Sequence, residues 1–203
     1  MNIHRLLVPC GVLKSAVVMF LALLGCGGDV GNVHVSDLRD GHNENPNEVI
    51  TTTKLTWIPT DGTDPIVVTW SDPELDGQPQ AEHLRLTLGQ SYVLHVEIFN
   101  ELEEPIEDLT PEFLDELEEH QVFFTGGAVV GPCNTHNTDA ILEHAYEDAD
   151  GFGHPVGERN VVRAFAAGTG TMNVLLRHMP SLNGTHIKTG DLADTMNRFG
   201  ASA

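Results

Sequence analysis

Residues 83–99 decide the fold class, and they read HLRLTLGQSYVLHVEIF. Apolar and polar side chains alternate on both sides of Gly89-Gln90, and a period of two is the pattern of a strand with one buried face. Two such runs joined by two residues that include a glycine predict a tight β-hairpin.

Further alternating or β-branched stretches flank this segment on both sides. Short strands separated by turn residues are typical of a β-sandwich. We therefore expect an all-β domain with a sandwich fold. Its other strands are expected at residues 51–57, 65–70, 121–125, 140–146, 161–166 and 172–178.

One stretch, residues 110–120, does not follow the β pattern. Thr110 suits the N-cap of a helix and Pro111 suits its first helical position. Phe113, Leu114 and Leu117 follow at helical spacing, with acidic residues between them. We expect a short helix inserted between two strands.

The N-terminus has the features of a bacterial lipoprotein precursor. Arg5 and Lys14 precede the apolar run 16–24, which is too short for a membrane span of roughly 20 residues. The run ends in Leu-Leu and is followed by Gly25 and Cys26, and this Leu-Leu-Gly-Cys sequence resembles the bacterial lipobox. That resemblance implies cleavage after Gly25 and lipidation of the Cys26 thiol. The residue after Cys26 is glycine instead of aspartate, which favours the outer membrane.

This assignment divides the chain into three parts. Residues 1–25 are a signal peptide, residues 26–48 are a flexible tether rich in Gly, Asn and charge, and residues 49–203 are the β-sandwich domain. Cys133 is the only unmodified cysteine left after processing, so the domain is expected to fold without an intrachain disulfide.

The charge of the chain is strongly acidic. It has 30 Asp and Glu against 10 Lys and Arg, for a formal net charge of −20, and cleavage would remove two basic residues and no acidic ones. Such a charge repels nucleic acid, so we expect no nucleic-acid partner. It favours solubility and the binding of cations or basic partners.

Two acidic loops are candidate calcium sites. Asp72 and Asp76 precede Gly77, and Asp148 and Asp150 precede a glycine in the same way. Alternating carboxylates can surround a hard cation. Neither loop has the complete spacing of an EF-hand, and an acidic turn chosen for backbone geometry is the favoured alternative for both.

Histidines suggest a transition-metal site. Imidazole suits zinc and copper, as does the thiolate in the pattern Cys133-x-x-His136 that precedes His144. We name His120, which follows a run of acids, and His178, at the end of a strand, as metal candidates. If they lie on neighbouring strands, a cross-strand separation of about 5 Å would let them share one ion.

Signatures of common enzymes are absent from the sequence. It contains no Gly-x-Ser-x-Gly, no His-Glu-x-x-His and no phosphate-binding glycine loop. We expect a protein that is not an enzyme, although a hydrolase with an unrecognised acid pair stays an alternative.

Several short segments together resemble a group of uncharacterised outer-envelope lipoproteins of the Bacteroidetes type. The resemblance covers roughly residues 50–180 and includes Trp70-Ser71-Asp72-Pro73, Glu119-His120-Gln121 and Leu176-Arg177-His178. It implies an immunoglobulin-like sandwich and an association with TonB-dependent outer-membrane receptors.

These observations predict a lipid-anchored binding or accessory module at the outer membrane that takes zinc, copper or calcium. A structural or adhesive surface domain is the alternative.

Overall fold

A computed structural model describes residues 16–23, 49–75, 79–191 and 194 of the chain. Cys26, Asp76 and the expected tether at 26–48 lie outside the described residues. None of the helices in the described part has the length and hydrophobicity to cross a membrane.

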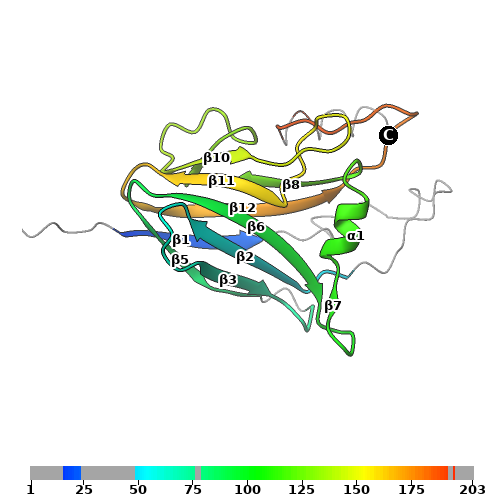
Figure 1. The fold of residues 1–203 in the computed structure, drawn as a ribbon, viewed down its shortest axis with the longest axis horizontal. Coiled ribbons are helices and arrows are strands. Elements are labelled where there is room, and N and C mark those ends of the chain that lie inside the picture. Colours follow the sequence, from blue (N-terminus) through cyan, green and yellow to red (C-terminus); the bar gives the residue numbers. More distant parts are fainter. Residues whose placement is uncertain (1–15, 24–48, 76–78, 192–193, 195–203) are drawn as a thin grey trace, which may run out of the picture.

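The described chain is mostly β, with one short helix, which confirms the expected all-β class (Figure 1). The elements in chain order are β1 (Ala16–Leu23), β2 (Thr52–Pro59), β3 (Ile66–Ser71), β4 (Gln80–Ala81), β5 (His83–Thr87), β6 (Ser91–Asn100), β7 (Glu107–Asp108), α1 (Thr110–Asp115), β8 (His120–Thr125), β9 (Val129–Val130), β10 (Leu142–Tyr146), β11 (Arg159–Ala164) and β12 (Thr169–His178).

The strands form two sheets that share one core. The smaller sheet has the order β5-β1-β12-β8, and the larger has the order β4-β3-β2-β6-β11-β10-β9, with β7 added beside β6. Alternate residues of β2, β5 and β6 are buried, as the period of two predicts. Their side chains join those of β8 and β12 in the main hydrophobic cluster, which includes Trp57, Leu86, Leu94, Phe124 and Met172.

The hairpin expected at residues 83–99 is wrong. β5 pairs with β1 in the smaller sheet, whereas β6 pairs with β2 and β11 in the larger one, so Gly89-Gln90 connects two sheets. Gly89 has a positive φ of 84°, and its N–H donates to the carbonyl of Ala164 in β11. Both strands bury alternate side chains in the same core, and this pattern fits strands that face each other as well as strands that pair.

The short helix is present between β7 and β8, but the expected cap is wrong. Leu109 is the N-cap, and helix α1 begins at Thr110 with Pro111 in its first turn. The Thr110 hydroxyl is engaged elsewhere, because it accepts a hydrogen bond from the backbone N–H of Ile98 in β6. Phe113 is buried in the core, and it fixes α1 over the end of β6.

Residues 16–23, which lie in the expected signal peptide, form β1 in this structure. β1 runs antiparallel to β5 and parallel to β12, and it lies between them.

Candidate metal centre

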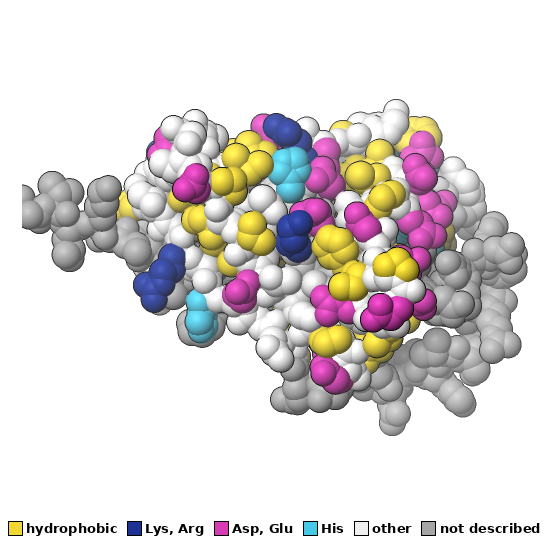
Figure 2. Space-filling view, turned by 60° about the horizontal axis from the view of Figure 1, so that its bottom comes forward, with side chains coloured by type: hydrophobic (Ala, Val, Ile, Leu, Met, Phe, Trp, Pro, Cys, Tyr) yellow, Lys and Arg dark blue, Asp and Glu magenta, His cyan; other side chains and the backbone are white. Residues whose placement is uncertain are grey.

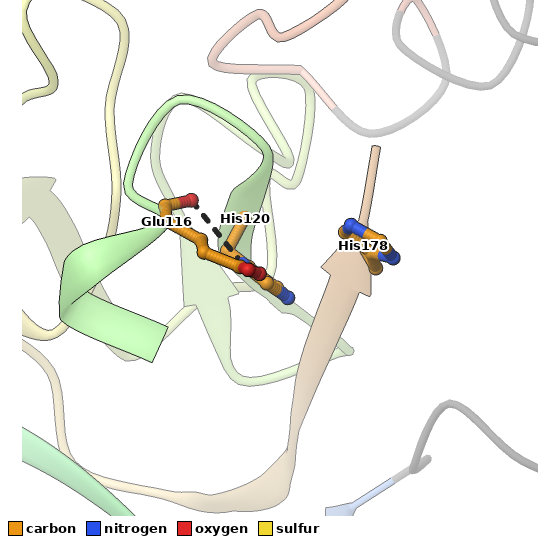
Figure 3. Close-up of side chains that lie close together, drawn as sticks. All are labelled: Glu116, His120 and His178. Carbon is orange, nitrogen blue, oxygen red and sulfur yellow. Dashed lines mark hydrogen bonds and ion pairs between the residues drawn. The ribbon is translucent and has the colours of Figure 1, made fainter. Parts of the chain in front are cut away.

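The candidate metal centre lies where the chain passes from the end of α1 to the start of β8. Helix α1 ends at Asp115, and the backbone of Glu116 leaves the helical conformation. The carbonyl of Glu116 accepts a hydrogen bond from the N–H of Glu119, which closes a turn before β8 begins at His120. This turn places the Glu116 side chain beside the His120 ring (Figure 3).

His120 and His178 are cross-strand neighbours. β8 and β12 are antiparallel, and the two histidines are paired in their register. Their rings stack with centroids 4.7 Å apart and an angle of 17° between the planes. The two histidines therefore lie on neighbouring strands, as the sharing of one ion requires.

Glu116, which sequence reasoning missed, completes a group of three candidate ligands with the two histidines. One ligand atom from each of Glu116, His120 and His178 lies within 4.8 Å of the others. In the described part of the chain, no other group of three or more His, Cys, Asp or Glu side chains is this close. The i,i+4 spacing of Glu116 and His120 is visible in the sequence, but the turn that brings them together is not.

The contacts of His120 orient it as a metal ligand. Its Nδ1 lies 3.2 Å from the Glu116 carbonyl oxygen, so we assign the proton to Nδ1 and the free lone pair to Nε2. Metal-binding histidines commonly donate their second N–H to a backbone carbonyl in this way. Phe113 packs edge-on against the ring at 5.6 Å between centroids.

Burial controls the protonation of His120. The side chain is almost completely buried, and desolvation, reinforced by the nearby His178, lowers the pKa of His120 to about 4. At neutral pH the imidazole is uncharged, and a proton does not compete with a metal ion for its lone pair.

Further carboxylates lie near the group of three. Glu119 Oε2 lies 3.4 Å from His178 Nε2. A hollow of about 390 Å³ adjoins the group, and the side chains of Asp115, Glu116, Glu118 and Glu119 line much of it. On the face drawn in Figure 2, acidic side chains gather toward the side on which α1 and β7 lie in Figure 1. This negative charge favours a cation at the site.

The carboxylates of the acidic loop at 148–158 accept hydrogen bonds from the protein itself. Asp148 accepts hydrogen bonds from the N–H groups of Gly157 and Arg159. Asp150 accepts from the N–H groups of Phe152 and His154, and its second oxygen lies 3.0 Å from the ammonium group of Lys188. The carboxylates are occupied by donors, which argues against calcium and favours the alternative of a structured turn.

The remaining candidates are separated from the histidine pair. Asp72 is buried beside β2, where its N–H donates to Thr51, and its expected companion Asp76 is outside the described residues. Cys133 is buried, and its Sγ lies 2.9 Å from the hydroxyl of Tyr146.

The zinc or copper group considered for Cys133, His136 and His144 does not assemble, which favours the alternative of a loop residue that happens to be cysteine. His136 is exposed, and His144 is buried with its Nε2 on Asn160.

No protein family, no curated protein and no solved structure matches this chain.

Proposed function

We propose that this chain is a lipid-anchored module of the bacterial outer membrane that binds a zinc or copper ion at Glu116, His120 and His178. The observation that carries the metal assignment is the convergence of two imidazoles and one carboxylate within 4.8 Å. The expected anchor at Cys26 and the resemblance to outer-envelope lipoproteins support the location.

The donor set selects the class of metal. Two nitrogen ligands and one oxygen ligand suit zinc or copper, whereas calcium prefers six to eight oxygen ligands. Of the three metals considered from the sequence, zinc and copper therefore fit this site and calcium does not.

Binding requires a rotation of one ring. Nearly parallel stacked imidazoles cannot both direct a nitrogen lone pair at one ion, because a metal lies close to the plane of each ligating ring. His120 is held by the Glu116 carbonyl and the Phe113 ring, whereas His178 is partly exposed at the end of β12. His178 is therefore the residue whose ring rotates, and Glu119 lies close enough to hold the ring in its new orientation.

Three protein ligands leave one coordination position open for water or for a partner's side chain. With no enzyme signature in the sequence, we assign the site to capture or transfer of the ion. Association with a TonB-dependent receptor, which the resemblance implies, belongs to the same proposal.

Zinc or copper binding is tested with residues 26–203 carrying Cys26→Ser. A hundredfold excess of ion over its dissociation constant stabilises the native state by about 2.7 kcal/mol, which raises Tm by roughly 5–10 °C. We expect His178→Ala to abolish that rise with little change in the metal-free Tm, because His178 is partly exposed. His120→Gln, whose amide can still donate to the Glu116 carbonyl, should do the same.

The matched control is His83→Ala with His136→Ala, which removes two exposed histidines. Calorimetric titration with zinc, copper and calcium measures the affinities directly. A wild-type domain that responds to none of them would reject the metal site and leave the structural or adhesive alternative.

We also propose that the two sheets form an immunoglobulin-like sandwich. The largely antiparallel pairing, the shared core and the passage from β5 to β6 between sheets support this. A solved structure with the sheets crossing near 90° instead of about 30° would contradict it.

A further inference from the structure

The segment that follows β12 carries a lysine whose amine is enclosed by the protein. Lys188 and Asp150 have no exposed side-chain surface, and Lys188 Nζ lies 3.0 Å from Asp150 Oδ2. The same Nζ donates to the backbone carbonyl of Leu117. Lys54 and Glu97 bring the same two chemical groups together at 2.7 Å, but their side chains are 37% and 32% exposed. The buried pair holds an amine against a carboxyl group away from water, which favours their condensation.

The two oxygens of the Asp150 carboxyl group have different surroundings. Oδ1 accepts hydrogen bonds from the backbone N–H groups of Phe152 and His154, each at 2.9 Å. Two such donors stabilise the negative charge that a carbonyl oxygen acquires when a nucleophile attacks its carbon atom. Oδ2 faces the amine of Lys188, so Oδ2 is the oxygen in position to leave.

The side chain of His154 offers a group for proton transfer at the leaving oxygen. Its Nδ1 lies 3.6 Å from Asp150 Oδ2. This nitrogen is buried and has no hydrogen-bond partner among the described residues, which is rare for a buried polar atom. The imidazole is therefore free to act as a general acid when the bond to Oδ2 breaks.

We propose that Lys188 and Asp150 condense to form an intramolecular amide bond. The ammonium group first passes one proton to Oδ2, and the neutral amine then attacks the carboxyl carbon. A C–N bond forms, and an electron pair of the C=O bond moves to Oδ1. His154, protonated beforehand, gives a proton to Oδ2 and takes one back from the amine nitrogen. The C–Oδ2 bond breaks, the double bond to Oδ1 forms again, and one water molecule leaves.

The charges of the pair make this reaction slow. Burial lowers the pKa of Lys188, which favours the neutral amine. Burial alone would raise the pKa of Asp150, but the backbone N–H of His154 and the Lys188 ammonium outweigh it and lower that pKa. The ion pair is therefore the resting state of the freshly folded chain. The neutral pair is a minor species, and the amide accumulates gradually.

The amide bond closes a covalent loop within the domain. Asp150 lies between β10 and β11, and Lys188 follows 38 residues later, after β12. A cross-link of this kind stabilises the native state mainly by restricting the unfolded chain. The domain is expected to have no intrachain disulfide, and the amide takes that role.

Mass spectrometry of the folded full chain tests the bond. The protein is kept at neutral pH for several days and then digested with trypsin, which does not cut after an acylated lysine. We expect a branched peptide that joins the segments of Lys188 and Asp150 and weighs one water molecule less than their sum. Its amount should increase with time, and the same chain held in urea should give none. Lys54 and Glu97, the exposed pair, should stay unlinked in the same digest.

Three variants test the roles of the groups. Asp150→Asn keeps an acceptor for the loop N–H groups and should give the same branched peptide with loss of ammonia instead of water, because the amine attacks the same carbon. His154→Ala keeps its backbone N–H but loses the imidazole, and it should slow the reaction by about 100-fold. His186→Ala is its control, because it removes a neighbouring ring with its centroid 6.0 Å from that of His154 and should leave the rate unchanged.

Two results would overturn these assignments. If the folded wild-type chain yields only linear peptides, no amide forms and the two side chains remain an ion pair. If His154→Ala and His186→Ala react at the same rate as wild type, His154 does not transfer the proton.

Discussion

At the scale of single residues, two buried histidines make the stability of the domain depend on pH. Burial is the main reason that the pKa values of His120 and His144 fall from 6.5 to about 4. In the unfolded chain both rings regain their ordinary pKa, so the unfolded state binds more protons between these values. Each histidine therefore lowers the free energy of unfolding, and it does so increasingly as the pH falls from about 6.5 to about 4.

We expect the urea midpoint of the metal-free domain to fall between pH 7 and pH 5. The full contribution is on the order of 3 kcal/mol per histidine once the pH reaches the folded pKa. His144→Gln should reduce the pH dependence, whereas His136→Gln, which changes an exposed ring, should retain it. Identical slopes for wild type and His144→Gln would show that this buried ring is not responsible.

At the scale of elements, a buried ion pair joins the segment after β12 to the loop between β10 and β11. Lys188 and Asp150 have no exposed side-chain surface, and the Lys188 ammonium also donates to the carbonyl of Leu117, just after α1. Burial lowers the pKa of Lys188, while Asp150 opposes that shift. Burial alone would raise the pKa of Asp150, but the backbone N–H of His154 and the Lys188 ammonium outweigh it and lower the pKa.

We expect Lys188→Met to lower the free energy of unfolding by about 3 kcal/mol, because it leaves a buried carboxylate without its counter-charge. Asp150→Ala should cost more, since the N–H groups of Phe152 and His154 also lose their acceptor. Chemical denaturation measures both losses.

The control for this pair is the exposed bridge between Arg159 and Glu147. Arg159→Met should cost less than about 1 kcal/mol. Equal losses for Lys188→Met and Arg159→Met would mean that the buried pair is no stronger than a surface one.

At the scale of the whole molecule, the proposed anchor at Cys26 would decide where the proposed metal site operates. We expect Cys26→Ser in the full chain to prevent lipidation and signal-peptide removal, because the acylated thiol is the feature that the processing recognises. Labelling with a radioactive fatty acid and fractionation of membranes measure this. A variant that is still acylated and still found in the outer membrane would reject Cys26 as the anchor.

The same preparation tests the partner. A TonB-dependent receptor should purify with the lipidated wild-type protein after mild detergent extraction. Recovery of the protein without any such receptor would contradict that part of the proposal.

The sequence alone was enough to predict the all-β class, most of the strand positions and the helical insertion. These features depend on local periodicity, because the spacing of apolar residues along a strand or helix shows which of its faces is buried. The same alternation predicted a hairpin at residues 83–99 that does not exist, because the pattern records which side chains are buried and says nothing about which strand lies alongside.

Tertiary structure decided which polar residues meet. His120 and His178 are separated by most of the second half of the chain, and only the register of β8 with β12 pairs them. Glu116 joins them because the chain turns sharply after α1, whereas Asp148 and Asp150 turn inward to satisfy backbone N–H groups. A ligand set depends on distances between elements, and those distances follow from how the two sheets bury a common core.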